Sequence, residues 1–224
     1  MNLLITTLGT TWQIVPELLG ITNPAQYDLF GGTEKIRAFR AVNRIEPVDE
    51  CWIVTTEGQR DLEKLRVWAD CWGIKLRIYV CRGVNSFSSE DELKRMRSLT
   101  YRVVLHGREK SERLYLSLSG GRKTMSADMQ DAGNLFGCDA MLHVVPSDKM
   151  PESMKDDNLT GPVPPEYNNA FVPLLVNGHV DTSLVVAGDN EPVKAGDYPL
   201  PAGDDMVIRF DEDKKLEAEI QERK

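Results

Sequence analysis

The sequence lacks most of the patterns that mark a metal or cofactor site. It has neither a G-x-x-x-x-G-K-[ST] loop nor a G-x-G-x-x-G fingerprint, which argues against ordinary nucleoside triphosphate or dinucleotide chemistry. The four cysteines form no C-x-x-C pair, and the three histidines show neither H-x-H nor H-E-x-x-H spacing. We therefore expect no metal and no cofactor.

Long apolar runs and a basic surplus are also missing. No apolar run approaches the roughly 18 to 20 residues that a membrane helix needs, and residues 1–8 lack a basic leader and indicate a core strand. The net charge of −8 argues against coating of bulk DNA or RNA, so a polyanion would need a local pocket. Scattered free thiols favour a reducing, cytoplasmic location.

Strands and helices alternate over the first two thirds of the chain. Apolar patterning predicts strands at 3–8, 51–55, 75–80, 114–118 and 140–145. Helices are predicted at 12–19, 34–44, 57–72 and 89–105, with a further helix ending at 136. This alternation predicts an α/β, Rossmann-like parallel sheet with helices on both faces, over residues 1–150.

The composition changes after residue 145, where nine of the twelve prolines fall between 146 and 201. Short strands are predicted at 168–176, 182–186 and 206–210, which makes 151–210 a small β-rich appendage or connector. Residues 211–224 form a predicted charged linker helix that would lead towards a missing effector domain. A frayed terminal helix explains the same residues equally well.

One run of residues, 114–125, combines a strand, a two-glycine turn and the start of a helix. Gly120 and Gly121 permit positive φ and a close approach of the backbone to a ligand. The helix that follows points unpaired N–H groups and its positive dipole end at the turn, and Arg122 and Lys123 add two full charges. This pattern favours a bound phosphate, although a common strand-to-helix turn with solvated cations would look the same.

The loops that follow the predicted strands should meet at one rim, because ligands of such sheets lie beyond the carboxyl ends of the strands. These loops carry glycines with hydroxyl, amide and cationic side chains, although short loops of this kind are usually polar in any case. The candidate ligand-binding residues are Gly9, Thr10, Thr11, Trp12, Thr56, Glu57, Gly58, Gln59, Asn85, Ser119, Gly120, Gly121, Arg122, Lys123 and Thr124. Trp12 would offer a stacking face or belong to the core.

Two of these turns resemble the motifs of the CARF domains of CRISPR-associated proteins. They are Thr-Leu-Gly-Thr-Thr-Trp at 7–12 and Leu-Ser-Leu-Ser-Gly-Gly-Arg-Lys-Thr-Met at 116–125. The resemblance covers roughly residues 1–150 and implies a homodimer, or an assembly of dimers, that binds a cyclic oligoadenylate of four or six units in antiviral defence. It implies that residues 9–12 line one side of the pocket and 119–124 hold the ribose-phosphate ring.

Proteins of this family usually carry an effector domain, and residues 8–19 most resemble sensors fused to an adenosine deaminase. The resemblance therefore implies an allosteric sensor that is not itself catalytic, attached to a hydrolase. The alternative is a ring nuclease that cleaves the cyclic ligand, with Lys123 and Ser119 or Thr11 in the reaction. Glu57 is the obvious general base in these loops for that alternative.

Overall fold

The computed structural model describes residues 1–26, 34–59, 61–146, 171–177, 194–201 and 206–210. The strands are β1 (Asn2–Leu8), β2 (Glu50–Thr56), β3 (Leu76–Cys81), β4 (Arg113–Ser117), β5 (Ala140–Pro146), β6 (Phe171–Asn177) and β7 (Val207–Phe210). The helices are α1 (Ile14–Thr22), α2 (Glu34–Asn43), α3 (Leu62–Trp72), α4 (Glu90–Lys110) and α5 (Lys123–Phe136), with a 3-10 turn, η4, at Ala195–Asp197.

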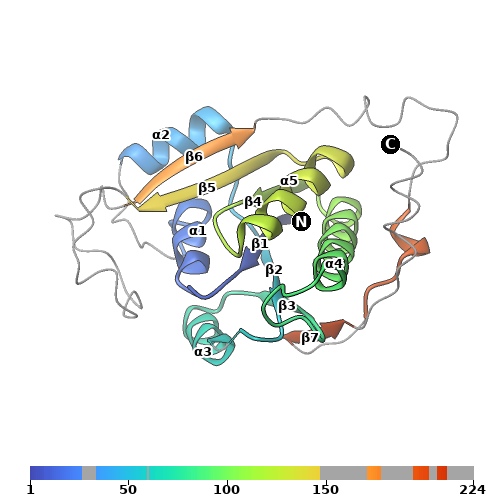
Figure 1. Cartoon of the computed structure of the whole chain (residues 1–224). Helices are drawn as coiled ribbons and strands as arrows, with labels where there is room; N and C mark the ends of the chain where they lie inside the picture. Colours follow the sequence, from blue (N-terminus) through green and yellow to red (C-terminus); the bar gives the residue numbers. More distant parts are fainter. Residues whose placement is uncertain (27–33, 60, 147–170, 178–193, 202–205, 211–224) are drawn as a thin grey trace, which may run out of the picture.

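The described strands form one sheet in the order β6-β5-β4-β1-β2-β3-β7 (Figure 1). All neighbouring pairs are parallel except β5 and β6, which are antiparallel. The chain builds outward from β1 through β2 and β3, then returns to β4 on the other side of β1. This confirms the predicted Rossmann-like sheet and places its reversal of strand order between β1 and β4.

Helices cover both faces of the sheet, as the sequence predicts. Side chains of α1, α2 and α3 share one buried cluster with Leu4, Ile53 and Ile78 of the sheet. Side chains of α4 and α5, which lie side by side in Figure 1, share a second cluster with Leu3 and Ile5. Successive residues of β1 thus face opposite cores, which explains why the strand is buried from residue 3 to residue 8.

Helix ends follow local chemistry. Ser89 precedes α4 and its Oγ accepts a hydrogen bond from the Glu92 N–H at 3.2 Å, while Glu90, Asp91 and Glu92 form an acidic first turn. Gly73 ends α3 in the left-handed region, with φ of 63°.

Three helix boundaries differ from the sequence predictions. α3 begins at Leu62 and not at 57, because Glu57 N–H donates to the Val84 carbonyl and joins a neighbouring loop. α1 continues to Thr22, beyond the predicted end at 19. α4 continues five residues beyond 105, where Glu109 accepts from Ala195 N–H and His106 Nε2 lies 2.9 Å from the Tyr198 carbonyl oxygen.

Two strands from the segment predicted as an appendage complete the central sheet. β6 pairs with β5 at one edge, and β7 pairs with β3 at the other, where Ile208 and Phe210 are buried. The strand predicted at 182–186 and the helix predicted at 211–224 lie outside the described residues. The division of the chain at 150 and 210 stays a prediction.

Candidate functional site

The predicted loops meet at the carboxyl edge of the sheet, on both sides of the strand reversal. They follow β1, β2, β3 and β4, which are consecutive neighbours in the order β4-β1-β2-β3. We call this surface the rim, defined by residues 9–11, 56–59, 82–88 and 118–124. It is the place where open α/β sheets bind ligands.

The loops after β1 and β4 touch through their backbones. The Thr7 hydroxyl donates to the Gly120 carbonyl at 2.6 Å. A Cβ on Gly120 would lie 1.7 Å from the Thr7 carbonyl oxygen, and a Cβ on Gly9 would lie 3.1 Å from the Gly121 Cα. Gly121 itself has φ of 78°. These glycines are therefore required by the close approach of the two loops and by a left-handed backbone.

The loops after β2 and β3 extend this chain of contacts. Gln59 Nε2 donates to the Gly9 carbonyl, which joins the β2 loop to the β1 loop. The Glu57 carboxylate accepts from Gly83 N–H at 2.9 Å, and a Cβ on Gly58 would lie 3.0 Å from the Asn85 carbonyl oxygen. The four loops thus form one continuous, hydrogen-bonded surface.

The N-terminus of α5 carries two positive side chains that have no acidic partner within the described residues. Arg122 is its N-cap residue, with no side-chain hydrogen bond to the first turn, and Arg122, Lys123 and Thr124 are exposed. Within the part of the chain that the structure describes, neither Arg122 nor Lys123 forms an ion pair. The first-turn N–H groups, the helix dipole and two exposed cations therefore converge on the turn, an arrangement suited to an anion.

The side chains of Ser126 and Ser119 hold the β4–α5 turn in place through hydrogen bonds. Ser126 Oγ lies 3.1 Å from the Leu118 carbonyl and 3.2 Å from the Gly120 carbonyl. Ser119 Oγ accepts from Val144 N–H at 2.6 Å, which fixes it against β5. The Ser119 hydroxyl keeps its own hydrogen for donation, so its predicted role towards a ribose-phosphate is compatible with this contact.

Trp12 lies in the core and not on the rim. Its side chain is only 2% exposed and packs in the cluster under α1. The ring therefore has no open face for a base, which corrects the expectation of stacking in favour of the core alternative. Its neighbours Thr10 and Thr11 are exposed. Thr56 and Gln59 are partly buried, and Glu57, Gly58 and Asn85 are exposed.

Sequence reasoning missed three residues that shape the rim. Thr7 positions Gly120, as described above. Met125, buried under the turn, accepts a weak hydrogen bond at its sulfur from Arg122 N–H at 3.4 Å. Phe87, on the loop after β3, lies under the Arg122 guanidinium, with 5.5 Å from Cζ to the ring centroid. Thr7 stands inside the first-strand motif, but no local pattern marks Phe87.

Within the described residues, no group of three or more histidine, cysteine, aspartate or glutamate side chains could hold a metal ion. Among those residues no helix is both long and apolar enough to cross a membrane.

Comparison with known proteins identifies the family. The family model of CRISPR-associated protein NE0113 (Cas_NE0113) matches residues 33–169, more than half of the chain. The chain belongs to this family. The matched residues include the loops after β2, β3 and β4, and so most of the rim of this CRISPR-associated protein.

Among solved structures, the chain is similar to Enterococcus italicus Csm6 bound to cyclic hexa-2'-fluoro-hexa-dAMP. The identity is 11% and the TM-score 0.44, and the match covers 84% of this chain and 43% of that one. The chain thus spans less than half the length of that protein. No curated protein matches the sequence.

Proposed function

We propose that this CRISPR-associated protein binds a cyclic oligoadenylate at the rim and passes the signal to an attached effector. The observation that carries the proposal is the N-terminus of α5, where Arg122 and Lys123 are exposed beside the close approach of Gly9 and Gly121. Family membership and the CARF-like motifs at 7–12 and 116–125 support the choice of ligand.

The chemistry of the rim fits the ribose-phosphate part of such a ring. Exposed cations form charge-assisted hydrogen bonds with phosphate oxygens, and first-turn N–H groups supply further donors. The hydroxyls of Thr10, Thr11 and Thr124 and the Asn85 amide are exposed around this centre and suit contacts with ribose and base edges.

The proposal includes a homodimer with one ring bound by two chains. A ring of four or six identical units has two-fold symmetry, so an isologous dimer uses the same rim twice on one ligand. Light scattering should give a dimer, and calorimetric stoichiometry should be one ring per two chains. A monomer that binds one ring per chain would contradict this part of the proposal.

The decisive experiment titrates the full chain with cyclic tetra-adenylate and cyclic hexa-adenylate by calorimetry. Lys123→Ala should weaken the binding of the active ring by about 10- to 150-fold, because a charge-assisted hydrogen bond contributes roughly 1.5 to 3 kcal/mol. Lys75→Ala is the matched control, since Lys75 is also exposed but precedes β3 at the opposite edge of the sheet.

Binding of neither ring by the unchanged chain would overturn the proposal, and equal affinity of Lys123→Ala would remove the phosphate role of the α5 turn. Chromatography of the same mixtures reports whether the ring stays intact. We expect the ring to be recovered uncleaved, because the rim segments contain no histidine and no second carboxylate to act with Glu57.

A further inference from the structure

Phe87 has an unusual backbone for an aromatic residue. Its φ is 55°, and within the described residues only one other non-glycine residue, Arg44, has a positive φ. A bulky side chain is disfavoured in this region, so the surrounding contacts must hold Phe87 there.

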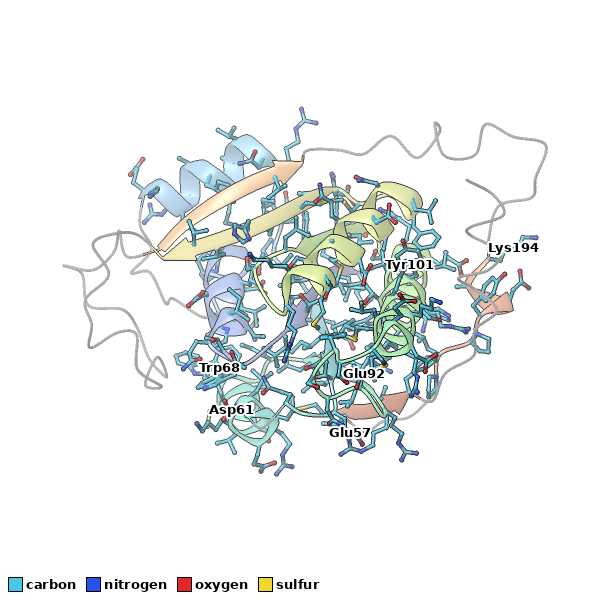
Figure 2. The ribbon with its side chains drawn as sticks, viewed as in Figure 1. Glu57, Asp61, Trp68, Glu92, Tyr101 and Lys194 are labelled. Atoms are coloured by element: carbon cyan, nitrogen blue, oxygen red, sulfur yellow. The ribbon has the colours of Figure 1, made fainter. Side chains whose placement is uncertain are left out.

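Two carboxylates hold the loop that carries Phe87. Glu92 Oε2 accepts from the Ser88 N–H and from the Ser88 hydroxyl at 2.9 Å, and Glu92 Oε1 accepts from Asn85 N–H at 3.4 Å. These hydrogen bonds, the Ser88 N–H first, lower the pKa of Glu92. Figure 2 shows Glu57, which accepts from Gly83 N–H, on the same side of the molecule as Glu92.

The loop brings the Phe87 ring to the anion-binding turn. Phe87 is partly buried against the cluster under α4 and α5, and the exposed Arg122 guanidinium covers it, with Cζ 5.5 Å from the ring centroid. The strands before these two residues, β3 and β4, are separated in the sheet by β1 and β2. An aromatic ring, a guanidinium and the N-terminus of α5 therefore meet on one side of the rim.

The contact between Arg122 and Phe87 is weaker than the contacts that each residue could make with a nucleotide, a phosphate on Arg122 and a base on Phe87. An exposed cation–π contact changes an equilibrium by only about 2- to 5-fold. A phosphate bound by a guanidinium contributes about 10- to 150-fold, and a base stacked on an aromatic ring about 5- to 150-fold. A ligand with both groups gains more than the separation of the pair loses.

We propose that Phe87 is a base-stacking residue of the rim and that Arg122 occupies its ring until a nucleotide binds. The guanidinium then turns to a phosphate, and the adjacent base takes its place on the ring. This inference assumes the proposed function and identifies the residue that reads the base part of the ligand, a role for which sequence reasoning named Trp12.

The test compares cyclic adenylate and cyclic uridylate rings of the size that binds, because a purine stacks more strongly than a pyrimidine. Phe87→Leu keeps an apolar anchor for the loop and removes the aromatic face. It should weaken the adenylate ring by about 5- to 150-fold and the uridylate ring by clearly less, whereas Lys123→Ala should weaken both rings equally. Phe87→Trp should retain adenylate binding.

Phe136→Leu is the matched control, because Phe136 is also a partly buried aromatic beside α4 but lies at the far end of α5. It should leave both affinities unchanged. Failure of the unchanged chain to bind any ring would overturn the proposed function and this inference together. Lys123-dependent binding that Phe87→Leu leaves intact, or weakens equally for both rings, would overturn the stacking role alone.

Discussion

The two edges of the sheet differ in how their arginine and lysine side chains are paired. At the amino edge, Asp139 accepts from Arg108 at 3.2 Å, from Arg113 at 3.0 Å and from Leu114 N–H at 2.9 Å. At the carboxyl edge, Arg122 and Lys123 are exposed and form no ion pair within the described residues. The charges of Asp139, Arg108 and Arg113 at the first edge bond to one another, whereas we propose that Arg122 and Lys123 at the second edge bind a ligand.

The same contrast holds for neutral polar groups. At the amino edge, Asn23 exchanges two hydrogen bonds with the Val48 backbone, at 2.7 and 3.0 Å, and is buried. At the carboxyl edge, Thr10, Thr11 and Thr124 are exposed. Substitutions should therefore separate stability from ligand affinity according to the edge they change.

The largest effect is expected for Gly120→Ala, which should lower both the stability of the fold and the affinity for the ring. Its Cβ would lie 1.7 Å from the Thr7 carbonyl oxygen, so the β1 and β4 loops must separate. We expect the free energy of unfolding in urea to fall by about 3 kcal/mol, with loss of ring binding. Gly196→Ala, where nothing lies within 4 Å of the added Cβ, is the control and should change stability by less than about 0.5 kcal/mol.

Asp139→Ala should lower the stability of the fold without changing the affinity for the ligand. Three donors lose their acceptor, and we expect the free energy of unfolding to fall by about 1 to 3 kcal/mol, measured by urea denaturation. The affinity for the ring should not change. Glu112→Ala removes one charge from the same edge, but its pair with the N-terminal amine is 3.7 Å long and largely exposed, so it should have almost no effect. A loss of affinity in Asp139→Ala would break the separation of the edges.

Glu17, in the first turn of α1, should make the stability of the fold depend on pH. Burial raises its pKa from 4.5 to about 8. Between these values the folded chain keeps a proton that the unfolded chain has lost, so the free energy of unfolding falls as pH rises.

Glu17→Gln should remove this fall and raise the free energy of unfolding by about 1 to 2 kcal/mol at pH 7. One titrating group can lower that free energy by at most roughly 1.4 kcal/mol for each pH unit above the pKa of the unfolded chain, and the expected change lies below this maximum. The two proteins should be equally stable at pH 4, where the carboxyl is protonated in both states. Urea titrations at pH 4, 6 and 8 measure the difference, and identical pH profiles would contradict it.

The smallest expected effect is that of Lys123→Ala on stability. The side chain is exposed and forms no ion pair within the described residues, so the free energy of unfolding should change by no more than about 0.5 kcal/mol. Ring binding should meanwhile weaken by about 10- to 150-fold. Circular dichroism and calorimetry on the same sample make the comparison. A substantial loss of stability would mean that Lys123 supports the fold and would remove its assignment to a ligand.

Much of the rim could be read from sequence because strand ends and glycine turns are local signals. The alternating leucines at 114–118, followed by Gly120 and Gly121, predicted the β4–α5 turn, and α5 begins at Lys123 as this pattern requires. Boundaries were less predictable. The helix predicted from 57 begins at Leu62 because Glu57 and Gln59 bond to neighbouring loops.

The sequence by itself determined the parallel α/β sheet, the four loops of its rim and the cationic turn, since backbone periodicity and glycine content act over a few residues. Only the tertiary structure decided that Trp12 is buried, that Phe87 meets Arg122, and that β6 and β7 complete the edges of the sheet. These outcomes depend on which distant segments pack together. An aromatic residue in a loop has the same local signal whether it enters the core or faces a binding site.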